Sequence, residues 1–190
     1  MYTKNFILEN TINRTFFDNL MTISDSKRDA TRERYNFACG YCGISEIDAG
    51  SELEIDHFHP IMHGGNDECD NLVYACSACN RNKASYWPSL DTPPHMHLLH
   101  PLTDDLNIHI TLLQDSYLAG LTPRGWFHIE WLHLNRPQLV TMRQRRAIYQ
   151  RTQKMIEKMQ QINHQLVERI ASQEQELYIL RQKVRRLMGG

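Results

Sequence analysis

Two Cys-x-x-Cys pairs constrain the fold of this chain more than any other feature of its sequence. Cys39 and Cys42 form the first pair, and Cys76 and Cys79 form the second. Two intervening residues let both sulfurs of a pair face one ion, and the second pair completes a tetrahedral set of four ligands. The spacing therefore predicts a structural zinc site that joins two distant segments.

A fifth cysteine, Cys69, stands outside this pattern and is expected to be a bystander in a loop. A secreted disulfide framework would need an even number of cysteines and a signal peptide, and residues 1–10 have no apolar core of the needed length. No stretch approaches the roughly 20 apolar residues of a membrane span. These features favour a reducing cytoplasm, no membrane partner, and thiolates kept for metal.

The segment between the two pairs has the pattern of a β-hairpin. Residues 53–58 alternate as a short strand does, and Pro60 ends this strand. A turn-rich loop with Gly64-Gly65 follows, and residues 71–75 form the return strand. A helix is expected from Cys76 to just before Trp87-Pro88. The order of strand, loop, strand and helix predicts a small α+β core over residues 39–90, which zinc stabilises.

Residues 1–38 are expected to form an N-terminal helical segment. Residues 1–22 hold an apolar stripe without a clean period, for which packing is the default role. Ser24 or Asp25 can cap a helix that runs to about Phe37.

Residues 91–135 are expected to form a linker and a short β-meander. Residues 88–105 are rich in proline and histidine and lack a regular pattern. Residues 107–113, 117–121 and 126–134 have the composition of three short strands, with turn residues between them. The meander makes the expected extension of the core β-rich.

Residues 136–190 predict one long helix. Asn135 is a suitable cap, Pro137 suits the first turn, and no Pro or Gly follows until Gly189. Apolar residues recur at steps of four and three from Met155 to Leu187, with a one-residue slip of phase between Leu166 and Ile170. So narrow a stripe is typical of a coiled-coil seam, which needs a partner helix from a second copy or another protein.

Charge is divided unevenly along the chain. Residues 136–190 carry 12 Lys and Arg against 4 Asp and Glu, whereas residues 1–135 carry 9 against 18. Such a basic tail is expected either to bind phosphates or an acidic partner protein, or to be a helix whose charged residues face only solvent, and the sequence favours neither interpretation.

The motif residues together resemble the HNH nucleases, whose core is the ββα-metal fold. The residues that carry the resemblance are Cys39, Cys42, Asp56, His57, Asn71, Cys76, Cys79, Asn80 and Lys83. It covers residues 39 to about 87, roughly a quarter of the chain. Two Cys-x-x-Cys pairs that bracket Asp-His, a Gly-Gly loop and Asn-Leu-Val form a specific combination.

The resemblance implies a role for each motif residue. His57 would be the general base that takes a proton from water. Asp56 would be a ligand of a catalytic divalent cation. Many family members have histidine directly after the last cysteine, and here Asn80 stands there. Its amide oxygen would be the second ligand, a donor that suits Mg²⁺ or Mn²⁺. Asn71 would pin the loop through backbone hydrogen bonds and orient His57.

Arg81 and Lys83 are expected to meet phosphates of the substrate. His59 and His63 stay open, because either could support the site from behind or be a polar loop residue.

The resemblance predicts a metal-dependent endonuclease that cleaves DNA. An RNA endonuclease, for example one that cuts tRNA, and a non-catalytic zinc-stabilised module that binds nucleic acid or protein remain alternatives. The joint presence of Asp56 and His57 favours the enzyme. The region from His100-Pro101 through residues 134–137 to the arginine-rich helix is similar to small HNH proteins of prokaryotic anti-phage systems such as Septu. That similarity implies a partner ATPase for the helix, with a homo-oligomer as the other expectation.

Overall fold

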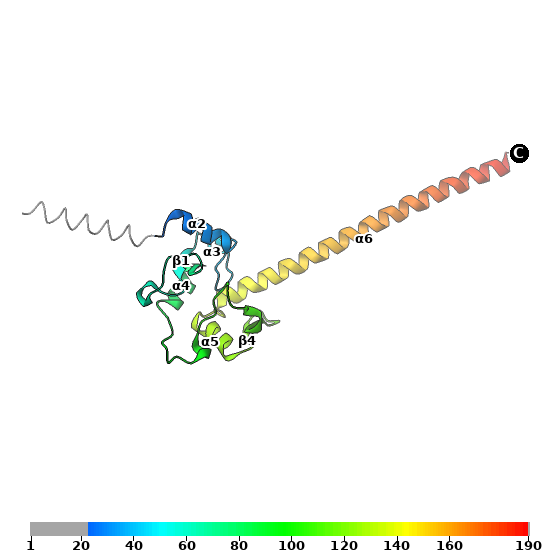
Figure 1. Cartoon of the computed structure of the whole chain (residues 1–190). Coiled ribbons are helices and arrows are strands. Elements are labelled where there is room, and N and C mark those ends of the chain that lie inside the picture. The colour runs from blue at the N-terminus through cyan, green and yellow to red at the C-terminus, as the bar shows by residue number, and fades with distance from the viewer. Residues whose placement is uncertain (1–22, 190) are drawn as a thin grey trace, which may run out of the picture. The chain divides into compact units, whose positions relative to one another are not determined.

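A computed structural model describes residues 23–189 of the chain (Figure 1). The chain divides into two compact units, residues 1–142 and residues 143–190. The apolar stripe expected in residues 1–22 lies outside the described residues.

Two helices frame the first cysteine pair. Helix α2 (Asp25–Arg34) begins after Ser24, whose side chain accepts a hydrogen bond from the backbone N–H of Lys27 at 3.4 Å. The short helix α3 (Glu46–Ala49) follows the pair. The Arg32 guanidinium donates to both carboxylate oxygens of Glu46, at 2.5 and 2.7 Å, and so ties the two helices together.

The segment between the cysteine pairs forms the expected hairpin and helix. Strand β1 (Glu54–His57) pairs antiparallel with β2 (Leu72–Ala75), and the first residue of β1 lies opposite the last residue of β2. The connecting loop contains one turn of 3₁₀ helix, η1 (Ile61–His63). Helix α4 (Ser77–Lys83) begins directly after β2, with Cys76 as its N-cap. The predicted order of elements, and with it the α+β class, is confirmed.

The core of the first unit combines this hairpin with residues far along the chain. Every residue of β2 is fully buried. Residues that precede and follow the proline-rich linker pack in the same cluster, among them Tyr35, Val73, Tyr74, Leu98, Ile129, Leu132, Leu134, Leu139 and Met142. The extension after residue 91 is therefore part of the same hydrophobic core as the hairpin.

The extension is less β-rich than its sequence predicts. Two short 3₁₀ turns, η2 (Pro94–Met96) and η3 (Leu106–Ile108), precede a hairpin of β3 (Ile110–Leu112) and β4 (Leu118–Gly120). These two strands were expected. The third strand, predicted over residues 126–134, is wrong: helix α5 (Pro123–Trp131) stands there.

Capping and packing explain why this segment is a helix. The Thr122 hydroxyl accepts a hydrogen bond from the backbone N–H of Gly125 at 3.1 Å, and Pro123 occupies the first turn. A Cβ on Gly125 would lie 1.9 Å from the carbonyl oxygen of His109, so the close approach of α5 to the β3 hairpin requires glycine. Gly125, His128 and Ile129 are buried at helical spacing.

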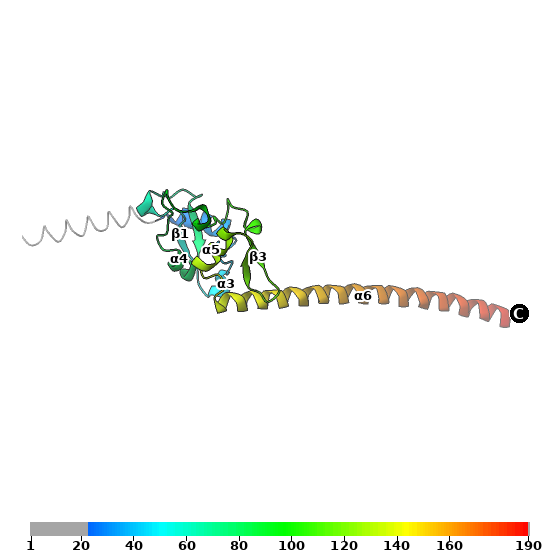
Figure 2. The same cartoon turned by 90° about the horizontal axis from the view of Figure 1, so that it is seen from below.

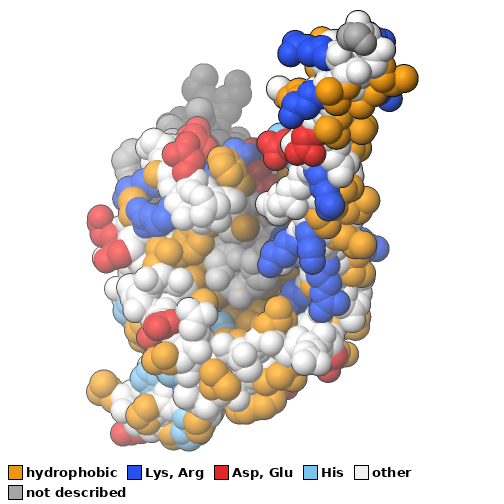
Figure 3. Space-filling model, turned by 90° about the vertical axis from the view of Figure 1, so that its right-hand side faces the viewer, with side chains coloured by type: hydrophobic (Ala, Val, Ile, Leu, Met, Phe, Trp, Pro, Cys, Tyr) orange, Lys and Arg blue, Asp and Glu red, His pale blue; other side chains and the backbone are white. Residues whose placement is uncertain are grey.

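The predicted long helix is present as α6 (Pro137–Met188), 52 residues or roughly 78 Å at 1.5 Å per residue. It is unbroken in both views (Figure 2). The prediction that Asn135 caps this helix is wrong: Arg136 directly precedes the helix, and the Asn135 side chain instead exchanges two hydrogen bonds of 2.8 Å with the backbone of Leu118 in β4. Residues 143–188 are mostly exposed, and the face of this helix that Figure 3 shows carries many hydrophobic, Lys and Arg side chains.

None of the helices that the structure describes combines the length and the apolarity needed to cross a membrane.

Candidate active site and metal centre

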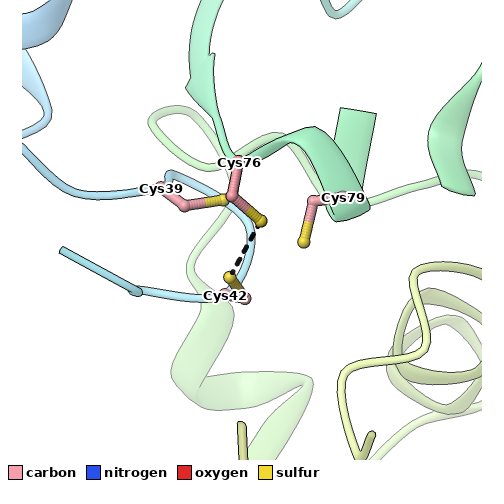
Figure 4. A group of neighbouring side chains, drawn as sticks. All are labelled: Cys39, Cys42, Cys76 and Cys79. Atoms are coloured by element: carbon pink, nitrogen blue, oxygen red, sulfur yellow. Dashed lines mark hydrogen bonds between the residues drawn. The ribbon is translucent and has the colours of Figure 1, made fainter. Parts of the chain in front are cut away.

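The four predicted cysteines converge on one point. Cys39 and Cys42 lie on the turn after α2, Cys76 lies at the end of β2, and Cys79 lies in α4. Their sulfurs are all within 4.8 Å of one another and point to a common centre (Figure 4). In the described part of the chain, this is the only group of three or more histidine, cysteine or acidic side chains close enough to share a metal ion.

The spacing of the sulfurs fits zinc. A tetrahedral ion with Zn–S bonds of about 2.3 Å separates its sulfurs by about 3.8 Å, and the Cys42 and Cys76 sulfurs are 3.8 Å apart. The cluster can therefore hold zinc and pin the hairpin to the turn after α2.

Sequence reasoning missed Arg136, which lies against this cluster. One terminal nitrogen of its guanidinium, Nη2, is 3.4, 3.5 and 3.7 Å from the sulfurs of Cys76, Cys79 and Cys42. The other terminal nitrogen, Nη1, donates to the carbonyl oxygen of Leu132 at 3.3 Å. The cation thus covers one face of the sulfur cluster and offsets part of its negative charge. No sequence motif predicts this contact, because Arg136 is 57 residues from the nearest of these cysteines in the sequence.

The Asp56 carboxylate is held inside the core. It is 6% exposed, accepts a hydrogen bond from the Tyr41 hydroxyl at 2.5 Å, and accepts another from the Lys83 ammonium group at 3.1 Å. Burial raises the pKa of the Asp56 carboxyl, against the opposing effects of Lys83 and Tyr41. The expected metal ligand is thus already engaged by two donors from the protein.

Lys83 does not lie where a phosphate could reach it. The side chain is 1% exposed, and its ammonium group also donates to the carbonyl oxygen of His57 at 2.7 Å. Burial lowers the pKa of this amine. The expected phosphate contact of Lys83 is therefore replaced by an internal ion pair. Helix α4 turns this residue toward β1, which the sequence motif alone does not reveal.

His57 has a different environment from its neighbour Asp56. Consecutive residues of a strand point to opposite faces, and the His57 ring contacts the loop between the strands. Its Nε2 is 2.6 Å from a carboxylate oxygen of Asp67. Because a carboxylate can only accept, Nε2 carries the proton of the neutral ring, which leaves Nδ1 as the basic nitrogen.

Asp67 is the second residue that sequence reasoning missed. Its backbone carbonyl accepts a hydrogen bond from the Lys27 ammonium group at 2.7 Å, which attaches the loop to α2. Its position in the loop after the predicted base was the available signal.

Asn71 fastens the same loop. Its amide oxygen accepts from the backbone N–H of His59 at 2.7 Å, and its amide nitrogen donates to the carbonyl oxygens of His59 and Asn66 at 3.0 and 2.7 Å. The backbone carbonyl of Asn71 accepts from Phe58 at 2.9 Å. These bonds hold both ends of the loop that carries Asp67.

Asn80 contacts Glu54, a third residue absent from the expected site. The Asn80 amide nitrogen donates to one carboxylate oxygen of Glu54 at 2.6 Å, and the Ser77 hydroxyl donates to the other at 2.5 Å. These hydrogen bonds, that of Asn80 first, lower the pKa of Glu54. Glu54 and Asp56 share one face of β1 by strand alternation. The face therefore offers oxygen donors of the kind that a hard divalent cation prefers.

The cations of the core are largely engaged by the protein itself. Within residues 23–142, the cations held by protein groups are Lys27, Arg28, Arg32, Arg34, Lys83, Arg124 and Arg136. Arg81 is exposed on α4, and its charge helps to lower the pKa of Glu54. Of the two cations expected to meet phosphates, Arg81 is the one that the fold leaves at the surface.

Aromatic rings border the loop side of the site. The Trp87 ring stacks on His59 with centroids 3.8 Å apart, and Phe58 meets His100 edge-on at 4.5 Å. His59 also bonds through Nε2 to the backbone carbonyl of His63 at 2.8 Å. His59 is thus a packed loop residue. A cavity of about 800 Å³ lies beyond Phe58 and Trp87.

Comparison with known proteins agrees with this geometry. No curated protein and no solved structure matches the chain. Residues 39–85, which run from the first cysteine pair to just beyond α4, match the family model of the HNH endonucleases, and this domain supports a nuclease function.

Proposed function

We propose that this chain is a metal-dependent HNH endonuclease that hydrolyses phosphodiester bonds of DNA. The hydrogen bond of 2.6 Å between His57 and Asp67 carries the proposal, because it gives the imidazole one defined basic nitrogen inside the matched domain.

His57 is the proposed general base. Its Nδ1 takes a proton from water, and the oxygen of that water attacks the scissile phosphorus. Asp67 holds the other nitrogen, so the ring keeps the tautomer and the orientation that this transfer needs. Asn71 positions the loop that carries Asp67.

Asp56 and Asn80 are the proposed ligands of the catalytic cation, and Glu54 is the neighbour that can join them. All three offer oxygen atoms, which suits Mg²⁺ or Mn²⁺ better than a soft ion. A carboxylate has about four lone-pair sites, so Asp56 can keep its bonds to Tyr41 and Lys83 and still bind a cation. The ion, when bound, supplies neutralisation of charge at the leaving 3′ oxygen.

Arg81 is the proposed phosphate contact of the core. It lies one residue after Asn80 on α4, and a phosphate contact fixes the position of the backbone without reading sequence. Lys83 acts from within, where its ammonium group bonds both Asp56 and the His57 carbonyl oxygen.

The test is incubation of purified, zinc-loaded protein with supercoiled plasmid and with total RNA, each with Mg²⁺, with Mn²⁺ and with EDTA. The proposal expects nicked or linear DNA with Mg²⁺ or Mn²⁺ and intact DNA with EDTA. His57→Ala protein purified in parallel controls for contaminating nuclease. Degradation of RNA alone would replace DNA with RNA as the substrate. DNA binding without any cleavage would establish the non-catalytic binding module.

A role as effector of a prokaryotic anti-phage complex is a further part of the proposal. It rests on the resemblance of His100-Pro101, residues 134–137 and the arginine-rich helix to small HNH proteins of anti-phage systems, and on the basic, apolar-striped surface of α6. A partner ATPase encoded alongside would be captured by co-expression with tagged full-length chain. Capture that persists in a chain ending at Met142, which keeps Leu139 and Met142 of the core, would exclude residues 143–190 of α6 as the binding element.

A further inference from the structure

Helix α6 carries a seam of exposed residues that are apolar at every position except Gln173. The seam consists of Met155, Met159, Ile162, Leu166, Ile170, Gln173, Leu177, Leu180, Val184 and Leu187. Its apolar members are between 46% and 85% exposed. Hydrophobic side chains on α6 are visible at the surface in Figure 3. So narrow a seam fits the side of another helix better than the face of a globular domain.

Charges beside the seam indicate the direction of that other helix. With Ile170 and Leu177 at position a of the heptad, Arg169 and Glu176 fall at position g, and Glu174 and Arg181 fall at position e. In a parallel pair of helices, each g residue faces the e residue five positions later on the other helix, and such pairs set partner and orientation.

A second copy of this chain places opposite charges at both sites. Arg169 would face Glu174 of the partner subunit, and Glu176 would face Arg181 of the partner subunit. All four residues are exposed on α6. Gln173 would meet Gln173 of the partner subunit across the seam, where each amide can both donate and accept. A polar residue in the seam fixes the register of two helices.

The slip between Leu166 and Ile170 supports the same arrangement. Four residues separate these positions where a strict heptad has three, and a partner helix must accommodate the shift at the same height. A parallel copy in register carries the same slip there. An antiparallel copy places the two slips at the same height only when the helices cross midway between Leu166 and Ile170. In that register, Arg169 no longer faces Glu174, and Glu176 no longer faces Arg181.

We propose that residues 155–187 of α6 form a parallel, in-register coiled coil with a second copy of this chain. The dimer stands independently of the nuclease proposal. One consequence does rest on that proposal: a parallel pair attaches two nuclease domains to the same end of the coiled coil, an arrangement suited to cutting both strands of a duplex.

A charge exchange between two full-length variants tests the pairing. One variant carries R169E and E176R, and the other carries E174R and R181E. Each variant alone places like charges opposite each other at both exchanged contacts, whereas a mixture places opposite charges there. Sedimentation equilibrium should show a wild-type dimer, a dimer weakened roughly tenfold or more for each variant alone, and a restored heterodimer in the mixture.

Circular dichroism of each variant checks that α6 remains helical. A wild-type chain that stays monomeric at high micromolar concentration would overturn the proposal and leave the seam to a helix of another protein. A mixture no tighter than either variant alone would overturn it as well.

Cysteine cross-linking tests the direction. In zinc-loaded C69S protein, Q173C places a thiol in the seam and Q175C places one on the outer face of the same helix turn. Mild oxidation should link Q173C chains into covalent dimers and leave Q175C chains unlinked. Equal linking of both, or linking of neither within a wild-type-like dimer, would contradict the parallel register. These readouts measure mass, so a loss of cleavage does not affect them.

Discussion

Removal of the Lys83 charge is the perturbation that best separates the structural and catalytic roles of the buried ion pair. Lys83 is 1% exposed, and its partner Asp56 is 6% exposed. Lys83→Met keeps most of the volume but leaves the Asp56 carboxylate buried with only the Tyr41 hydroxyl as a donor. Breaking a buried pair from one side costs about 3–5 kcal/mol of the free energy of unfolding. This range of about 3–5 kcal/mol includes the loss of the hydrogen bond from Lys83 to the His57 carbonyl oxygen.

The second half of the experiment is a double-mutant cycle. Asp56→Asn leaves the Lys83 ammonium group buried without a counter-charge and should cost a similar amount. The double variant has no uncompensated charge, so its loss of stability should fall about 2 kcal/mol or more short of the sum of the single losses.

Urea denaturation followed by circular dichroism measures the three variants beside the wild type, with bound zinc checked in each sample. Additive losses within about 0.5 kcal/mol would refute the ion pair. An Asp56→Asn protein with unchanged stability and lost Mg²⁺-dependent cleavage would show that the carboxylate serves the catalytic metal alone.

Three further predictions follow from other contacts. Cys76→Ser should abolish zinc binding and lower the melting temperature, because metal binding contributes to folding. Elemental analysis and thermal denaturation measure the two effects, and the control variant His57→Ala should keep its zinc. Arg136→Gln removes the cation that lies against the sulfur cluster. A chelator should therefore extract zinc from this variant roughly tenfold faster than from the matched surface variant Arg145→Gln. Equal extraction rates would exclude a role of Arg136 in retaining the zinc. Burial lowers the pKa of His128 to about 4 in the folded chain. As the pH drops from 6.5 to 4, this histidine therefore binds a proton in the unfolded chain before it does so in the folded chain, and the free energy of unfolding should fall by about 3 kcal/mol. His128→Gln should flatten this dependence in urea titrations, and an unchanged slope would contradict it.

The sequence predicted those parts of the fold that local pattern determines. The spacing of the cysteines and the alternation of residues 53–58 were sufficient for the hairpin and for α4, because both features restrict the backbone directly. The long helix followed from the absence of Pro and Gly.

Tertiary packing decided what the sequence did not. Residues 126–134 are rich in aromatic and branched side chains, which favours a strand, yet the Thr122 cap and the close approach of Gly125 to His109 select a helix. Lys83 was expected at the surface, because a lysine after a zinc pair does not reveal which face of α4 carries it.

Contacts between residues that are distant in the sequence could not be predicted from the motif either. Asp67 is ten residues from His57, and its contact depends on how Asn71 folds the loop. Arg136 reaches the sulfur cluster because the α5–α6 turn packs against it, where Nη1 bonds the Leu132 carbonyl oxygen. Such contacts arise from the assembled fold, which a local pattern of residues does not encode.

The proposed mechanism requires His57 to remove the proton from the attacking water. Single-turnover cleavage of a labelled duplex with Mg²⁺ measures this step, with His63→Ala, in the loop that follows β1, as the matched control. His57→Ala should slow cleavage by roughly 100-fold or more, the scale of a lost general base, and Asp67→Asn should slow it less because the ring remains. His63→Ala should cleave at the wild-type rate. Equal single-turnover rates for His57→Ala and His63→Ala, in zinc-loaded and folded protein, would exclude His57 as the general base.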